Sequence, residues 1–192
     1  FMHKKLPNFY HFVDHLNINK ITKINKHIGI IYRNYQIKPN IKEIINFKNY
    51  CKNNDKIFLI ANNFNLACQL NLDGFYVPAF NRSNISKYRN NRLIIVGSAH
   101  NLGEIKVKEA QGVNQIFLSP IFKTLKSNNY LGLFRFNLLS KHTNKPIIAL
   151  GGINSKNIKK IKMTNSIGIA SITYIKKNKN PAKILYGLKY KN

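Results

Sequence analysis

The sequence predicts an α/β fold, a single parallel (β/α)8 TIM barrel, and three observations point to it. Short apolar runs of strand length recur along the chain. Helix-length stretches with amphipathic spacing lie between most of them, and this alternation is typical of a parallel sheet covered by helices. Polar residues follow the apolar runs directly, where a barrel binds its ligands. A doubly wound open sheet is the alternative, because the pattern does not show whether the sheet closes.

Eight apolar runs are predicted to be strands. They are Phe9–Val13, Ile28–Tyr32, Ile57–Ala61, Gly74–Val77, Leu93–Val96, Gln115–Leu118, Ile147–Leu150 and Ile167–Ala170. Apolar spacing predicts helices over Ile41–Cys51, Asn65–Leu70, Leu102–Gln111, Phe136–His142, Asn157–Met163 and Pro181–Tyr190. Short helices with less regular spacing are predicted over Leu16–Lys26 and Ser83–Arg89.

Two glycines end the most informative strand, Pro146–Leu150. Gly151 and Gly152 at a strand end expose backbone N–H groups, and a nearby helix start adds the positive end of its dipole. Asn154-Ser155 are expected to cap a helix that begins near Lys156. These features predict a phosphate cradle, although a glycine pair alone is also what a tight turn needs.

The other strand ends carry polar and cationic residues with almost no carboxylates. The set comprises Asp14, Arg33 to Tyr35, Asn62 and Asn63, Pro78 to Asn81, Ser98 and His100, Ser119 to Lys126, Gly151 and Gly152, and Ser171 and Thr173. Guanidinium, ammonium, hydroxyl and backbone N–H groups are the donors that bind phosphate. The sequence therefore predicts a phosphate-binding mouth at the carboxyl ends of the strands.

Length and composition indicate one globular domain over residues 1–192, with 44% hydrophobic and 11% aromatic residues. No apolar run reaches the length of a membrane span, and no signal peptide is visible. Phe1 before Met2 indicates a fragment or a translated read. Two cysteines, Cys51 and Cys68, are too few for a disulfide framework, so we expect a reducing, cytoplasmic compartment.

The charge is strongly positive, with 32 Lys+Arg against 6 Asp+Glu and a net charge of +26. Such a balance can indicate nucleic-acid binding. The basic residues are scattered along the whole chain, however, and the abundance of Lys, Asn, Ile, Tyr and Phe is what an A+T-rich genome encodes. We therefore do not expect nucleic acid as a partner, whereas small anionic substrates would be attracted in either case.

Four motifs in order carry a family resemblance: LDGFYV (72–77), VGSAHNLGEI (96–105), LSPIFKT (118–124) and IALGGIN (148–154). Over about residues 8–182 the chain resembles the thiamine phosphate synthase/TenI family of (β/α)8 barrels. The resemblance implies a transferase that joins an aminopyrimidine methyl diphosphate to a thiazole phosphate, giving thiamine phosphate and pyrophosphate. Such an enzyme must stabilise the departing pyrophosphate with cationic groups and usually Mg²⁺.

The resemblance also implies site residues. Those expected at the diphosphate are Arg33, Ser98, Thr124 and Lys126, and those expected at the thiazole phosphate are Gly151, Gly152 and Ser171. Arg33, Ser98 and Lys126 are expected to act in catalysis, because each can offset charge on the leaving group.

Several of these residues also have a plain structural explanation. Ser98 or His100 can cap the helix at Leu102, Thr124 and Lys126 can be ordinary loop surface, and Ser171 can cap a short helix.

The family's metal-binding carboxylates are missing by this alignment. Amides stand in their places, at Asn62 and Asn81, and Asn34 and Tyr35 replace the Glu and Lys that usually follow Arg33. An amide oxygen is uncharged and Mg²⁺ prefers carboxylates. We therefore expect any activity to depend only weakly on Mg²⁺.

Other functions stay open at this point. The lost carboxylates favour a catalytically degenerate or re-purposed phosphate-ligand binding barrel. Thiazole tautomerisation is disfavoured, because Pro120 stands where TenI-type enzymes carry a His. The expected partners are small phosphorylated thiamine precursors, and neither a membrane nor an oligomeric state is indicated.

Overall fold

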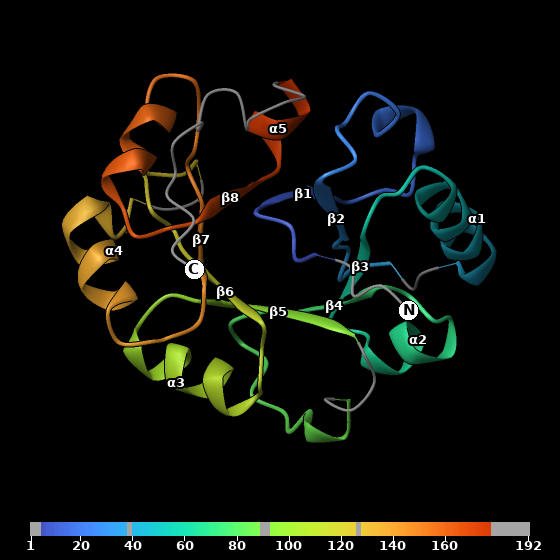
Figure 1. Cartoon of the computed structure of the whole chain (residues 1–192), viewed down its shortest axis with the longest axis horizontal. Coiled ribbons are helices and arrows are strands. Elements are labelled where there is room, and N and C mark those ends of the chain that lie inside the picture. The colour runs from blue at the N-terminus through green and yellow to red at the C-terminus, as the bar shows by residue number, and fades with distance from the viewer. Residues whose placement is uncertain (1–4, 38–39, 89–92, 126–127, 178–192) are drawn as a thin grey trace.

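The strands of this chain close into one parallel barrel, seen end-on in Figure 1. The computed structural model describes residues 5–37, 40–88, 93–125 and 128–177. The strands are β1 (Phe9–Val13), β2 (Ile28–Tyr32), β3 (Phe58–Ala61), β4 (Gly74–Val77), β5 (Ile94–Ala99), β6 (Gln115–Leu118), β7 (Ile147–Leu150) and β8 (Gly168–Ser171). Each pairs in parallel with the next, and β8 pairs back with β1. The predicted barrel is confirmed, and the open sheet is excluded.

Helical segments lie outside the ring of strands (Figure 1). The α-helices are α1 (Ile41–Asn53), α2 (Phe64–Gln69), α3 (Leu102–Ala110), α4 (Gly132–Ser140) and α5 (Thr173–Lys177). The 3₁₀ helices are η1 (Ile18–Lys20), η2 (Ser86–Tyr88) and η3 (Ile158–Met163). The helix predicted over Pro181–Tyr190 lies outside the described residues.

The two short helices predicted from irregular spacing, Leu16–Lys26 and Ser83–Arg89, are wrong as α-helices. Only η1 and η2 form there. In the first segment Asn25 Oδ1 accepts from the N–H of His27 at 2.9 Å, so a side chain takes a donor that a helix would use. Asn84 Oδ1 does the same with the N–H of Ser86. Such local bonds compete with helix formation.

Two further helices can be compared with their predictions. The helix predicted over Asn157–Met163 forms as the 3₁₀ helix η3 from Ile158, two residues after the start expected near Lys156, and Asn154 Oδ1 accepts from the N–H of Lys156 at 2.9 Å in the turn before it. α4 begins at Gly132, four residues before the predicted start at Phe136. The backbone bond from Gly132 N–H to the carbonyl of Ile121, at 3.0 Å, anchors that earlier start.

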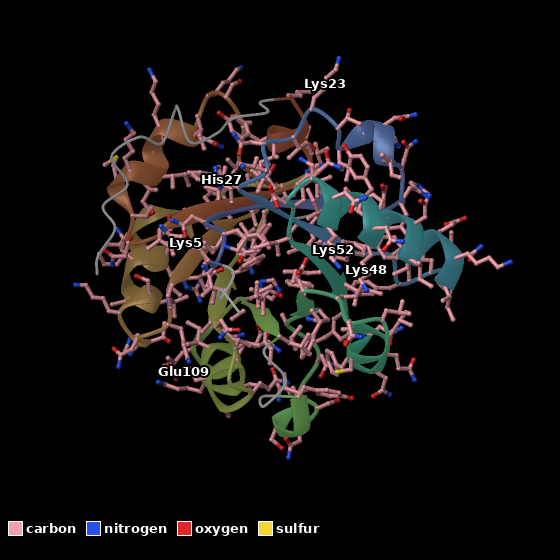
Figure 2. The ribbon with its side chains drawn as sticks, turned by 45° about the vertical axis from the view of Figure 1, so that its right-hand side comes forward. Lys5, Lys23, His27, Lys48, Lys52 and Glu109 are labelled. Carbon is pink, nitrogen blue, oxygen red and sulfur yellow. The ribbon has the colours of Figure 1, made fainter. Side chains whose placement is uncertain are left out.

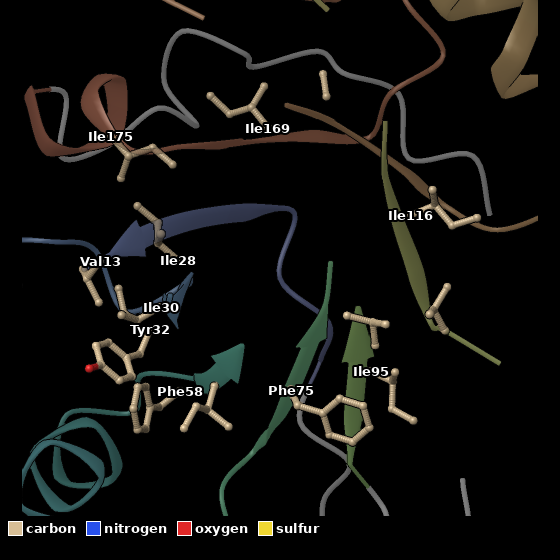
Figure 3. Packing of buried hydrophobic residues seen from close by; sticks show 14 of the residues in the cluster. Val13, Ile28, Ile30, Tyr32, Phe58, Phe75, Ile95, Ile116, Ile169 and Ile175 are labelled. Carbon is tan, nitrogen blue, oxygen red and sulfur yellow. The ribbon is translucent and has the colours of Figure 1, made fainter. Parts of the chain in front are cut away.

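Two layers of apolar side chains make the core. The outer layer lies between the strands and the helices, and Figure 3 shows part of it, including Ile30, Phe58 and Ile169. The inner layer fills the barrel with aromatic rings. Tyr10, Phe12, Tyr76 and Phe117 are each 3% exposed or less, with ring centroids 4.8 to 6.2 Å apart in the contacting pairs. Because these rings pack the interior, a ligand has room only at the carboxyl ends of the strands.

Basic side chains are scattered over the surface, whereas those of Lys56 and Lys108 are buried. Figure 2 labels Lys5 ahead of β1, Lys23 in the β1–β2 connection, and Lys48 and Lys52 on α1. Among the described residues, no helix is long and apolar enough to cross a membrane.

Candidate functional site

Arg33 follows β2 directly and lies at the mouth of the barrel. Its N–H donates to the carbonyl of Val13 at 2.8 Å, which fixes the backbone at this strand end. The guanidinium carbon lies 4.6 Å from the centroid of the Phe12 ring, so the cation rests on the aromatic floor of the barrel. Half-buried there, Arg33 keeps donors for a ligand at the mouth.

Tyr76 connects Arg33 to Ser98. The phenol donates to Ser98 Oγ at 2.8 Å, and the Arg33 guanidinium lies close enough to favour the ionised phenol. Burial raises the pKa of Tyr76, and Ser98 and Arg33 offset only part of this rise, so the phenol is protonated at neutral pH. Because Ser98 Oγ accepts from Tyr76, its own proton is free to be donated elsewhere. We refer to Arg33, Tyr76 and Ser98 as the guanidinium network.

The amides of Asn62 and Asn81 bond to each other across the ends of β3 and β4. Asn81 Nδ2 donates to Asn62 Oδ1 at 2.6 Å, and Asn81 Oδ1 accepts from the N–H of Ser83 at 2.8 Å. Asn62 has a φ of 56°, in the left-handed region that Asn tolerates better than most residues. We call this contact the amide bridge.

The ends of β7 and β8 hold the residues predicted for the thiazole phosphate. Gly151 and Gly152 have φ values of 96° and 69°, as predicted for a glycine turn. A Cβ on Gly152 would lie 2.4 Å from the carbonyl oxygen of Phe122, so the connection after β6 packs directly on this glycine. The helix that follows is the six-residue η3, and the α-helix dipole expected behind the glycines is therefore absent.

Ser171 caps a helix, one of the two roles open to it. Its Oγ accepts from the N–H groups of Tyr174 at 2.8 Å and Ile175 at 3.3 Å. The hydroxyl proton stays available as a donor. Within the described residues, no hydrogen bond joins Ser171 or Gly152 to the guanidinium network.

The connection after β6 is described only in part. Thr124 is half-buried there, and Lys126 lies outside the described residues. Beside this connection His100 Nδ1 lies 2.8 Å from the carbonyl oxygen of Ser119 and 3.2 Å from its Oγ. Neither His100 nor Ser98 caps α3, because Asn101 Oδ1 accepts from the N–H of Glu104 at 2.9 Å.

Cavities open between the described residues at this end of the barrel. The first, of about 310 Å³, lies beside the amide bridge. It is lined by Tyr32, Asn34, Tyr35, Ile37, Ile60, Ala61, Asn62, Asn63 and Phe80. The rings of Tyr35 and Phe80 meet edge to face there, with centroids 5.7 Å apart. The second, of about 440 Å³, is lined by His100, Asn101, Ser119, Pro120, Asn129, Tyr130, Leu131 and Arg135.

The residues present do not fit a Mg²⁺ site. The Asn81 amide turns its N–H₂ toward Asn62, a donor where a cation needs an oxygen, and both amides are uncharged. Among the residues that the structure describes, no group of three or more His, Cys, Asp or Glu could hold a metal ion.

Comparison with known proteins identifies the family. A profile described as thiamine monophosphate synthase matches residues 23–175. This chain belongs to that family. It is 32% identical over 125 residues to a thiamine-phosphate synthase of Methanococcus vannielii, with 63% of this chain and 60% of that protein covered. A thiamine-phosphate synthase of Prochlorococcus marinus is 34% identical over 139 residues, which cover 70% of this chain and 39% of that protein.

A solved structure shows the same fold over nearly the whole chain. Thiamine phosphate pyrophosphorylase from Pyrococcus furiosus superposes with a TM-score of 0.74 at 19% identity, covering 97% of this chain and 98% of that one. The match confirms the thiamine phosphate synthase-like barrel. This chain spans 60% of the Methanococcus vannielii relative and 39% of the Prochlorococcus marinus relative, which is less than two thirds of each.

Sequence reasoning missed Tyr76 and Phe12 as parts of the site. Both lie on strands that were predicted correctly, and the alternation of inward and outward residues could have placed them inside the barrel. It also missed Lys108 of α3, which is fully buried. No sequence signal marks Lys108, because its burial depends on the shape of the neighbouring strand.

Proposed function

We propose that this chain is a thiamine phosphate synthase-like transferase, which joins an aminopyrimidine methyl diphosphate to a thiazole phosphate. Membership of the family supports the reaction class. The guanidinium network at the mouth is the observation that carries the proposal, because it supplies fixed donors for a diphosphate. The partners in this proposal are the two phosphorylated precursors.

In the proposed reaction, the bond from the pyrimidine methylene carbon to the diphosphate oxygen breaks, and pyrophosphate leaves with the electron pair. Arg33 donates to the leaving oxygens, and Ser98 adds its hydroxyl proton as a second donor. The thiazole nitrogen then bonds to the methylene carbon, which gives thiamine phosphate. Gly151, Gly152 and Ser171 are assigned to the thiazole phosphate, through backbone N–H groups and one hydroxyl.

The packed rings below the mouth serve this chemistry by excluding water. Phe12 and Tyr76 are 2% and 3% exposed, with centroids 5.2 Å apart, so the interior beneath the reacting carbon is closed. A cation-like carbon that forms above them meets the thiazole before water. The cavity beside the amide bridge gives the pyrimidine ring a place between polar and aromatic side chains.

The direct test is to incubate the purified chain with both precursors, in EDTA and in Mg²⁺, and to assay thiamine phosphate. We expect slow formation of product that changes little with Mg²⁺. Arg33→Ala should then lower product formation, and Lys52→Ala, which removes one exposed cation from α1 outside the predicted site, is its matched control. Absence of product in both buffers would refute the transferase.

One observation favours a second function, a barrel that binds the phosphorylated ligand without turnover. The amide bridge occupies the positions that resemble the family's metal-binding carboxylates, so the metal-assisted route is lost. Binding of the thiazole phosphate without any product would support this second function.

A further inference from the structure

Lys108 of α3 is fully buried, which is rare for a lysine. Its ammonium donates to the backbone carbonyl of Asn81 at 2.7 Å and to Gln111 Oε1 at 2.9 Å. The aliphatic part lies against β5, where a Cβ on Gly97 would come within 2.8 Å of Lys108 Cδ. A glycine at position 97 therefore makes the space through which the lysine reaches the connection after β4.

Gln111 supports the same connection one helical turn later. Its Nε2 donates to the carbonyl of Asn81 at 3.1 Å and to the carbonyl of Ser83 at 2.9 Å. Lys108 and Gln111 thus hold two carbonyls of the segment that follows β4. We call these two side chains the α3 clamp.

The same segment determines which way the Asn81 amide faces. The N–H of Ser83 donates to Asn81 Oδ1, so this oxygen faces Ser83 and the N–H₂ faces Asn62. If the segment after β4 shifted, the bond from Ser83 to Asn81 Oδ1 and the bond from Asn81 Nδ2 to Asn62 would be lost together. The α3 clamp and the amide bridge are therefore two ends of one hydrogen-bonded unit, which connects α3 to the mouth.

We propose that Lys108 and Gln111 are positioning residues, which hold the amide bridge closed so that the mouth binds diphosphate without a divalent cation. The proposal rests on the proposed function for its ligand. A bridge between neutral amides joins the ends of β3 and β4 directly, where two carboxylates would repel each other. Asn81 then stays fixed beside the diphosphate, and Arg33 supplies the charge.

The test measures the affinity of the full chain for inorganic pyrophosphate by calorimetry in EDTA. We expect binding in EDTA, and about tenfold weaker binding in Lys108→Met, which keeps the buried stem but removes the ammonium. Lys106→Met is the matched control: it removes the same charge from the same helix, but Lys106 is exposed and bonds to Glu109 and His142. Its affinity should stay within about twofold of the parent.

A double-mutant cycle separates positioning from a general loss of stability. If Lys108 acts through the amide bridge, Asn62→Ala should weaken pyrophosphate binding, and adding Lys108→Met should then change it less than about twofold. If circular dichroism shows that Lys108→Met is not folded, the same cycle is measured with Gln111→Met in its place.

Three results would overturn the inference: no pyrophosphate binding in EDTA, unchanged affinity in folded Lys108→Met, or additive effects in the cycle. The proposed function is decided separately, by formation of thiamine phosphate. A coupled cycle without product would refute only the transferase, whereas product without coupling would refute only the positioning role.

Discussion

Replacing both amides of the bridge by carboxylates should lower the free energy of unfolding by more than the two single replacements together. In Asn62→Asp the new carboxylate still accepts from Asn81 Nδ2, now 2.6 Å away. In Asn81→Asp the carboxylate still accepts from Ser83, and the Asn62 amide can turn its N–H₂ toward it. We expect each single variant to change the free energy of unfolding by less than about 1 kcal/mol.

The double variant places two carboxylates where that 2.6 Å contact now lies. With charge centres about 4 Å apart, their repulsion is about 1 kcal/mol in water and about 4 kcal/mol at the effective dielectric constant of a protein surface. Because Asn62 is exposed, we expect a coupling energy near the lower value, about 1–2 kcal/mol.

Urea denaturation of the four proteins at pH 7.5 measures this coupling. Mg²⁺ at a few millimolar should remove most of it in the double variant and leave the parent unchanged, with KCl at equal ionic strength as the control. Additive free energies, or a parent protein that Mg²⁺ stabilises as much as the double variant, would refute the reasoning.

Three further outcomes are expected. Arg33→Ala should lower turnover by about 10²- to 10³-fold in the thiamine phosphate assay, because a fixed donor to the leaving group is lost. Activity within tenfold of the parent would count against the guanidinium network. Gly152→Val should lower the free energy of unfolding by about 2–3 kcal/mol, because φ is 69° and the new Cβ would lie 2.4 Å from the Phe122 carbonyl oxygen. The control Gly103→Ala in α3 should not lower it. Equal melting temperatures for the two variants would contradict this prediction. Burial lowers the pKa of Lys108 from 10.5 to about 8, with Glu104 opposing the shift and Arg82 adding to it. The folded state then binds fewer protons than the unfolded state above pH 8, so the free energy of unfolding should rise by about 1–2 kcal/mol between pH 8 and 10, and this rise should be absent in Lys108→Met.

The strands could be predicted nearly to the residue, because buried parallel strands are short apolar runs with abrupt polar ends. Phe9–Val13 and Gln115–Leu118 agree at both boundaries. β5 runs on to Ala99, beyond its predicted end at Val96, because Gly97 and Ser98 continue the pairing with β4 and β6. A glycine and a serine look like a strand end in sequence, and only the neighbouring strands show that they continue it.

The site could be predicted as a set of positions but not as a set of contacts. The sequence places Arg33 and Ser98 at the mouth, yet nothing in it shows that Tyr76 joins them. It likewise marks Asn62 and Asn81 as unusual without showing that they bond to each other. These contacts depend on strand register and on side-chain direction, which appear only once the barrel is closed.

The amide bridge joins the ends of β3 and β4 at the two positions where the family resemblance implies carboxylates. A carboxylate opposite an amide would make the same hydrogen bond, whereas two carboxylates would repel each other. The two amides instead form a neutral bridge that the α3 clamp supports. Asp14 is the only carboxylate among the described strand-end residues, and its side chain is 79% exposed, so solvent screens its charge. Glu43, in the first turn of α1, is a second carboxylate near this edge, and burial raises the pKa of Tyr32 with help from both acids. We expect a mouth with so few carboxylates to attract anions, and the net charge of +26 to add to that attraction. In the proposed transferase, the diphosphate would therefore be neutralised by fixed organic cations such as Arg33 rather than by carboxylate-bound Mg²⁺.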